Sequence, residues 1–181
     1  MTRRAAVRAP ETPPGGVRRF GDRIYDDKRV DPYQARGKYH EPTTCTDCGA
    51  VFRNGRWTWG DAPKDGHRDR CPACRRVHDK LPAGSVTLAG DFYAAHREEL
   101  LRLVRNEAEH ERGGHPMNRI MDIDESPDRA VVTTTDIHTP HRIGAALSRA
   151  YHGDIDIRYG EDEYSVRVSW RRKLIRRRRS I

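Results

Sequence analysis

Four cysteines in two pairs are the residues of this chain with the clearest chemistry. The pairs are Cys45-Thr46-Asp47-Cys48 and Cys71-Pro72-Ala73-Cys74, and 22 residues separate them. A CxxC turn presents two thiolates to one ion, so two such turns supply the four soft ligands that a tetrahedral zinc ion prefers. A closed shell of four thiolates leaves no position for water. The sequence therefore predicts a structural zinc ion held by Cys45, Cys48, Cys71 and Cys74.

Two other interpretations of these residues remain open at this point. The thiols can instead form disulfides or stand unrelated to one another, and His67 or His78 beside the second pair can replace a cysteine as ligand. The N-terminus has no secretory signal and the chain has no apolar run long enough for membrane insertion, so we expect a cytoplasmic protein. In that reducing compartment paired cysteines more often bind metal than form disulfides.

The positive charge of the chain is concentrated at its ends. The formal net charge is +8, and it divides into +5 for residues 1–40, +2 for 41–84, −6 for 85–170 and +7 for 171–181. Residues 1–40, rich in Pro and Gly, are predicted to form a disordered basic arm, and 171–181 a basic tail. Such ends attract a polyanion such as RNA, DNA or an anionic membrane surface, whereas the acidic middle segment repels it. A tail that only promotes solubility is the alternative.

Residues 41–84 are predicted to form a zinc ribbon around the cysteines. Asn54-Gly55 is typical of a type I′ turn, so the strands on either side of it form a hairpin in which Arg53 faces Arg56. One surface of this hairpin is then aromatic, with Phe52, Trp57 and Trp59, and the other is cationic. The aromatic side chains stack on bases or, as we favour, form the small core of the ribbon.

Arginines near the predicted zinc ion are the candidates for phosphate contacts. Guanidinium groups bind phosphate through two parallel hydrogen bonds, and a rigid metal core holds them in place. The alternative is a solvated surface without a partner. The candidate nucleic-acid-binding residues of the ribbon and tail are Arg53, Arg56, Arg75, Arg76, Arg171, Arg172, Lys173, Arg176, Arg177, Arg178 and Arg179.

Residues 85–170 are predicted to form an α+β domain. Apolar periodicity and turn residues predict strands at 86–88, 119–123, 130–135, 154–158 and 164–170, with helices at 91–109 and 139–152. The first helix is expected to begin at an Asp91 cap and the second at a Thr139 cap, and Asp136 with His138 can cap and orient the loop before it. This order is typical of a ferredoxin-like, split βαβ sandwich with one extra strand. His138, His141 and Arg142 gather at the second helix, but no free cysteine, glycine-rich loop or paired carboxylates accompany them, so we expect no enzyme.

The order of these motifs resembles a known family. The double CxxC unit, the run Thr135-Asp136-Ile137-His138 before Arg142-Ile143-Gly144-Ala145-Ala146-Leu147, and Tyr164-Ser165-Val166-Arg167-Val168 are similar to the N-terminal half of the ribosomal large-subunit export adaptor family, especially its archaeal-type members. The resemblance covers about residues 45–170. Family members usually carry more cysteine pairs and further domains after this region, so nuclear export is not implied here. The chain resembles a reduced, stand-alone bacterial relative.

These observations predict a non-enzymatic zinc protein that associates with RNA, most directly with the large ribosomal subunit as the resemblance implies. Two alternatives remain. The first is an adaptor whose acidic α+β domain binds a protein partner, with the basic ends as tethers. The second is a DNA-binding, transcription-related zinc protein, which is weaker because no recognition helix is evident. The oligomeric state does not follow from the sequence.

Overall fold

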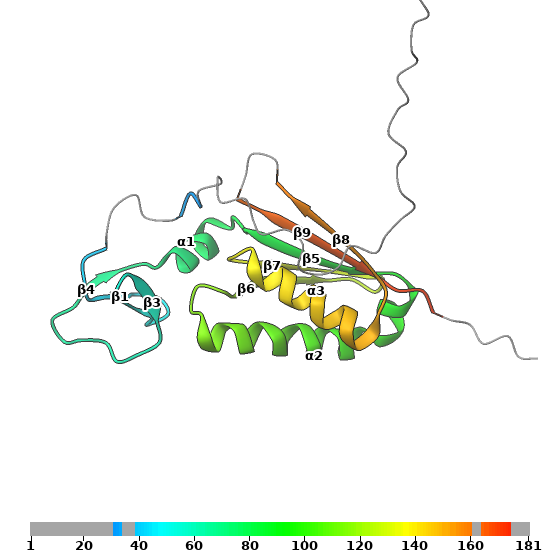
Figure 1. The fold of residues 1–181 in the computed structure, drawn as a ribbon, viewed down its shortest axis with the longest axis horizontal. Coiled ribbons are helices and arrows are strands. Elements are labelled where there is room, and N and C mark those ends of the chain that lie inside the picture. The colour runs from blue at the N-terminus through cyan, green and yellow to red at the C-terminus, as the bar shows by residue number, and fades with distance from the viewer. Residues whose placement is uncertain (1–30, 34–38, 161–163, 175–181) are drawn as a thin grey trace, which may run out of the picture.

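A computed structural model describes residues 31–33, 39–160 and 164–174 of the chain. Most of the predicted basic arm and the arginines at 176–179 therefore lie outside the described residues. The described part forms three helices and two sheets, which confirms the mixed α+β class. In Figure 1 the small sheet lies at one end of the long axis, the large sheet and its helices occupy the other, and α1 lies between them.

The small sheet contains four short strands in the order β3-β2-β1-β4. Its strands are β1 (Thr43–Cys45), β2 (Val51–Arg53), β3 (Arg56–Thr58) and β4 (His67–Asp69). The β2–β3 hairpin has the predicted register, with Phe52 opposite Trp57 and Arg53 opposite Arg56. Asn54 (φ 54°) and Gly55 (φ 76°) both have positive φ, as a type I′ turn requires.

Two features of this unit differ from the predicted ribbon. Residues 67–69, for which the sequence predicts no strand, form β4, which pairs in parallel with β1. The second cysteine pair does not lie on a second β-turn, because it begins helix α1 (Pro72–Asp79) with Cys71 as N-cap and Pro72 in the first turn. Proline is well suited to that position because its missing N–H would have no partner within the helix.

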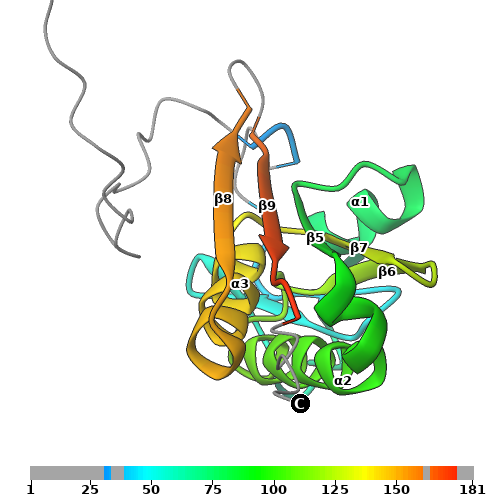
Figure 2. The ribbon, with the colours of Figure 1, turned by 90° about the vertical axis from the view of Figure 1, so that its right-hand side faces the viewer.

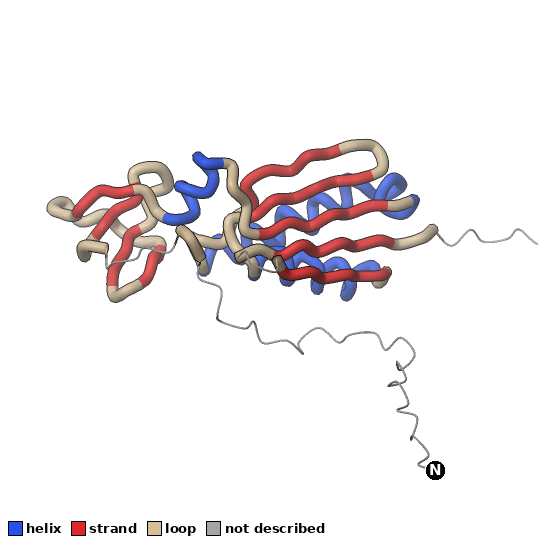
Figure 3. Tube along the Cα trace, turned by 90° about the horizontal axis from the view of Figure 1, so that it is seen from above, coloured by secondary structure: helices blue, strands red, loops and turns tan. Residues whose placement is uncertain are grey.

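The large sheet has five strands in the order β6-β7-β5-β9-β8. Its elements follow one another as β5 (Gly84–Ala89), α2 (Asp91–Gly114), β6 (Ile120–Glu125), β7 (Arg129–Thr134), α3 (His138–Tyr151), β8 (Asp154–Tyr159) and β9 (Val166–Arg171). Every strand predicted for this domain is present, with slightly different ends. Figures 2 and 3 show α2 and α3 together on one face of this sheet.

The strand pairing contains two split βαβ units. Strands β5 and β6 are parallel with β7 between them, because each pairs antiparallel with β7. Strands β7 and β8 are likewise parallel, but β5 and β9 both lie between them. Strand β9 therefore pairs in parallel with β5 inside the sheet.

The core of the large domain lies between this sheet and the two helices. The fully buried side chains include Leu88, Leu100, Ile143, Leu147 and Trp170. They alternate along the strands and recur at helical spacing along α2 and α3, as burial of one face of each element requires.

The caps predicted at Asp91 and Thr139 are wrong, whereas the alternative that Asp136 caps the loop before α3 is confirmed. The N-cap of α2 is Gly90, and Asp91 lies in the first turn without a side-chain cap bond. The Asp136 carboxylate, rather than Thr139, satisfies the start of α3, accepting 2.7 Å hydrogen bonds from the amides of His138 and Thr139. A charged acceptor binds these free amides more strongly than a hydroxyl does. Helix α2 also continues to Gly114, five residues beyond the predicted end.

Candidate metal centre

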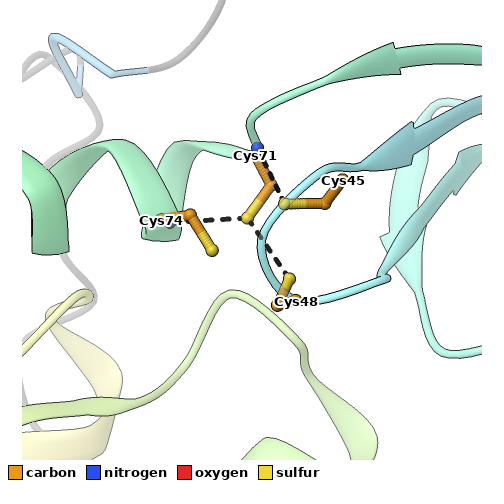
Figure 4. A group of neighbouring side chains, drawn as sticks. All are labelled: Cys45, Cys48, Cys71 and Cys74. Carbon is orange, nitrogen blue, oxygen red and sulfur yellow. Dashed lines mark hydrogen bonds between the residues drawn. The ribbon is translucent and has the colours of Figure 1, made fainter.

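The four cysteine sulfurs converge between the small sheet and α1, as Figure 4 shows. Cys45 ends β1, Cys48 follows it in a tight turn, and Cys71 and Cys74 lie at the start of α1. All four sulfur atoms lie within 4.8 Å of one another, and three of the four residues are buried. The structure therefore brings together the four predicted ligands.

The sulfur spacing fits a tetrahedral metal ion. Ligands about 2.3 Å from a central ion lie roughly 3.8 Å from each other. The Cys48 and Cys71 sulfurs are 3.8 Å apart, far beyond the roughly 2.05 Å of a disulfide bond. All four cysteines are free thiols. A metal centre is thus the interpretation that the geometry supports, in place of two disulfides.

The backbone around the first pair forms a tight turn that points both sulfurs inward. The Cys45 amide donates to the Ala50 carbonyl at 2.7 Å, and the Gly49 amide donates to the Cys45 carbonyl at 3.1 Å. Gly49 adopts φ 76°, a conformation that favours glycine. This turn directs the Cys45 and Cys48 side chains toward the second pair.

The second pair uses the N-terminus of α1. The Cys71 sulfur accepts from the Cys74 amide at 3.4 Å, and the Cys71 amide donates to the Cys45 sulfur at 3.3 Å. The first turn of α1 contains no acidic residue, so its positive end faces the sulfurs without competition. Amide donors and a helix N-terminus both stabilise thiolates over thiols. These two features therefore favour the thiolate form, which binds metal.

Two arginines form contacts at the metal centre, one with the sulfurs and one with the turn that carries the first pair. The Arg70 Nε is 2.6 Å from an Asp47 carboxylate oxygen, an ion pair that joins the segments carrying the two CxxC pairs. The Arg119 Nη2, which comes from the large domain, lies 3.4 Å from the Cys71 sulfur and 3.3 Å from the Cys74 sulfur. Neither arginine was predicted as part of the site, because nothing in the local sequence around Arg119 indicates that it approaches residues more than 40 positions earlier.

The crowded sulfurs shift one another's pKa values. A hydrogen bond shared with Cys71 lowers the pKa of the Cys48 thiol to about 4 and raises that of Cys71. Burial raises the pKa of Cys74 to about 11, although Arg119 opposes this shift. Protons and a metal ion therefore compete for the same four sulfurs.

The two histidines weighed as alternative ligands lie elsewhere. His67 is exposed and stacks on His40 with ring centroids 4.5 Å apart, and His78 pairs with the neighbouring Asp79 carboxylate at 2.9 Å. Among the described residues, the only group with metal-binding geometry consists of the four cysteines. Replacement of a cysteine by His67 or His78 has no support in this arrangement.

The four ribbon arginines differ in their exposure and in their ion pairs. Arg53 and Arg56 are exposed at the hairpin tip and form no ion pair with any described residue. Arg75 binds the Asp69 carboxylate at 2.8 Å and remains partly exposed.

Arg76 is different, because its side chain is only 4% exposed. It pairs with Asp31 and donates to the Leu81 carbonyl at 3.2 Å, and its guanidinium lies over the Tyr33 ring at 4.4 Å. The prediction that Arg76 contacts phosphate is therefore wrong for this conformation. Its charge is already paired and its surface is covered.

The aromatic side chains of the hairpin mostly pack within the protein. Phe52 and Trp57 contact each other and Tyr39, with ring centroids 5.1 to 5.5 Å apart. Trp59 is 37% exposed and donates its indole N–H to the Arg112 carbonyl at 2.6 Å. This packing supports a structural role rather than base stacking.

Of the predicted tail, Arg171, Arg172 and Lys173 are described. Arg171 and Lys173 are exposed, whereas Arg172 lies over the Phe92 ring at 4.1 Å. The remaining candidates, Arg176, Arg177, Arg178 and Arg179, lie outside the described residues. The end of β9 thus places two exposed cations at the opposite end of the molecule from the small sheet (Figure 1).

A separate pocket of about 680 Å³ contains the histidines at the start of α3. Arg142 pairs with the buried Glu111 carboxylate, and the His141 Nε2 lies 2.9 Å from the Tyr159 hydroxyl. Its polar groups are thus largely paired with one another. The lining residues are Glu111, His115, Asn118, Ile137, His138, His141, Arg142 and Tyr159.

No family model, curated protein or solved structure matches this chain. Among the described helices, none combines the length and the apolar content that crossing a bilayer requires.

Proposed function

We propose that this chain is a non-enzymatic zinc protein that associates with RNA, specifically with the large ribosomal subunit. The observation that carries this proposal is the exposed Arg53–Arg56 pair at the tip of a hairpin whose base is joined to the four-cysteine centre. The family resemblance of residues 45–170 supplies the ribosomal subunit as the expected partner. We also propose that residues 84–171 belong to the ferredoxin-like sandwiches, with β9 inserted, on the basis of the two split βαβ units.

Zinc is the metal that best suits the ligand set. Four thiolates in tetrahedral spacing favour soft or borderline ions, and zinc tolerates this geometry without redox chemistry. All four positions are filled by sulfur, so a zinc ion here has no open site for a substrate. This is the reason that we assign the metal a structural role and no catalytic step.

The arginine pair is suited to an anion because its two charges repel each other in the free protein. Like charges directly opposite on paired strands destabilise a sheet, and an anion between them removes that cost. The hairpin tip is held in shape by Glu41, whose carboxylate accepts from the Asn54 and Gly55 amides at 2.7 and 3.1 Å. Phosphate oxygens at Arg53 and Arg56 therefore meet two guanidinium groups carried by a backbone turn of fixed shape.

The basic features at the two ends support contact with an extended polyanion. Arg171 and Lys173 lie at the end of β9, far along the molecule from the small sheet. A long RNA or a ribosomal surface can reach both ends at once, whereas a small anion cannot. Two separated contacts on one polyanion bind more tightly than either alone.

RNA binding is tested by comparing two double variants that lose the same charge. We expect Arg53→Ala/Arg56→Ala to weaken binding of labelled single-stranded RNA and of purified large subunits. The slope of log affinity against log salt should fall by about 1.4, since each lost phosphate contact on a single strand accounts for about 0.7. The control is Arg97→Ala/Arg149→Ala, which removes two exposed arginines from α2 and α3.

Fluorescence anisotropy at several salt concentrations measures the affinities, and sedimentation measures subunit binding. Equal affinity and equal salt slope for the two double variants would refute a role for the hairpin tip. Subunit binding that is insensitive to salt and to both variants would favour the protein-adaptor interpretation instead.

A further inference from the structure

Arg119 lies in the segment that follows α2, yet its side chain reaches the cysteines of α1. Its backbone is fixed by Thr135 after β7: the Arg119 amide donates to the Thr135 hydroxyl at 3.0 Å, and the Thr135 amide donates to the Arg119 carbonyl at 2.9 Å. Thr135 is buried. The large domain therefore determines where this guanidinium points.

The sulfur contacts are the main polar partners of this side chain. One nitrogen, Nη2, contacts the sulfurs of both Cys71 and Cys74, and the buried Nε of Arg119 has no hydrogen-bond partner among the described residues. No described carboxylate forms an ion pair with Arg119. A half-buried cation without a carboxylate partner is costly, so negatively charged sulfurs explain its position.

The charge of a metal-loaded centre matches this requirement. Four thiolates around a divalent ion carry a net charge of −2, and the excess is delocalised over the sulfurs. A guanidinium at hydrogen-bond distance from two of them offsets part of that charge. Outer groups of this kind orient the ligands and tune the affinity of the metal.

Further contacts between the small unit and the large domain come from the last turn of α2 and the segment after it. Met117 packs against the cysteine cluster, the Arg112 carbonyl accepts the Trp59 indole N–H at 2.6 Å, and the Arg112 guanidinium lies 5.7 Å from the centre of the Trp59 ring. Residues 112–119 are thus the seam between the two sheets. His115 and Asn118 of this segment also line the pocket at the start of α3.

We propose that Arg119 is a positioning residue for the metal centre, and that through it metal binding holds the small sheet against the large domain. Loss of the metal frees the Cys71 and Cys74 sulfurs from the fixed positions in which they contact Arg119, so the seam opens and the Trp59 contact is lost. Loss of Arg119 leaves the sulfur charge uncompensated, so the metal is released faster. This inference rests on the metal part of the proposed function and is independent of RNA binding.

The test compares zinc-loaded wild-type protein with Arg119→Ala, Arg119→Gln and Arg119→Lys. Transfer of zinc to a colorimetric chelator measures the rate of zinc release. The indole N–H resonance of Trp59 in an NMR spectrum reports whether the contact between Trp59 and Arg112 is intact. We expect release about 10 to 100 times faster for Ala and Gln, the range for lost outer-shell partners. Lys, which keeps the charge, should restore slow release in part. Arg105→Ala, which removes an exposed arginine paired with Glu125, is the charge-matched control.

The Trp59 resonance should leave its wild-type position in metal-loaded Arg119→Ala and Arg119→Gln, because its contact with the Arg112 carbonyl is lost. The Trp170 indole, which donates to the His152 carbonyl at 2.7 Å, reports that the large domain is intact. If Arg119→Ala does not fold, the comparison of Gln with Lys decides the outcome.

Equal release rates for wild type, Gln and Lys, or an unchanged Trp59 resonance after zinc is removed, would overturn the proposal. Failure of the wild-type protein to bind zinc at all is a different result, because it refutes the metal centre itself.

Discussion

Removing the metal, or replacing Cys71 with serine, should unfold the small sheet and α1 while the five-stranded sheet stays folded. Cys71 is the most connected ligand: it is fully buried, its sulfur faces Cys48 at 3.8 Å, and it caps α1 by accepting from the Cys74 amide. A serine hydroxyl keeps the capping ability but is a poor ligand for a thiolate-type centre. The substitution therefore separates metal binding from helix capping.

The expected magnitude follows from what is buried around the site. The buried cluster consists of three cysteine ligands and two alanines, Ala50 and Ala73. The two methyl groups contribute about 2 kcal/mol by burial, whereas binding of a structural zinc ion contributes about 10 to 16 kcal/mol in comparable small units. Without the ion, the remaining apolar contacts are too few to keep this unit folded.

The three tryptophans of the chain provide the assay. Trp57 lies in β3 and Trp59 follows it, whereas Trp170 is fully buried in β9. In a spectrum of indole N–H resonances, a chelator should move the signals of Trp57 and Trp59 toward unfolded positions and leave that of Trp170 in place. Added zinc should restore the wild-type spectrum but not that of Cys71→Ser.

The reasoning fails if reduced, metal-free protein keeps all three resonances at their original positions. It also fails if Trp170 moves together with the other two, because the large core would then depend on the metal as well.

Two other predictions concern the large domain. Gly84→Ala should lower the free energy of unfolding by about 1 to 3 kcal/mol, because an added methyl group would lie 2.6 Å from the Asp136 carbonyl oxygen. Urea denaturation measures this change. The control is Gly113→Ala, whose added methyl group meets no atom within 4 Å. Burial lowers the pKa of His141 from its ordinary 6.5, so the unfolded chain takes up its proton more readily, and stability should fall as the pH drops below that value. His141→Gln should flatten this pH dependence in urea titrations, whereas the exposed His110→Gln should leave it unchanged.

The helices and strands of the large domain could be predicted because the apolar residues of each recur with the period of a helix or of a strand. Alternating apolar residues mark the strands, and Leu100, Leu101 and Val104 of α2 are buried as their spacing predicts. At the start of α2, by contrast, the apolar residue Ala94 is exposed. Helix α2 is kinked at His96 (φ −126°), so the turn before it presents Phe92 and Tyr93 to the core instead.

The pairing of the elements could not be predicted in the same way. Whether the second cysteine pair begins a helix or a turn depends on residues 72–79, whose short apolar pattern does not distinguish the two, although Pro72 after Cys71 is compatible with a helix start. The order of the strands depends on contacts between residues far apart in the chain, which a local pattern does not contain.

The same limit applies to the arginines around the metal centre. Arg76 has the local appearance of an exposed cation beside a cysteine, but Asp31, 45 residues earlier, pairs with it. Arg119 is 45 residues beyond Cys74 and nevertheless contacts its sulfur. The cysteines themselves were predictable because two CxxC pairs are the spacing typical of a four-thiolate metal site.

The position of β9 has a consequence for how the chain reaches its folded state. This strand is the last of the large domain, yet it lies between β5 and β8, and it pairs with β5 from about 80 residues earlier, Gly84 opposite Val166. During synthesis, the edge of β5 that pairs with β9 therefore stays unpaired until nearly the whole domain has left the ribosome. Such a sheet is expected to assemble late and slowly, since its central pairing closes the longest loop of the domain.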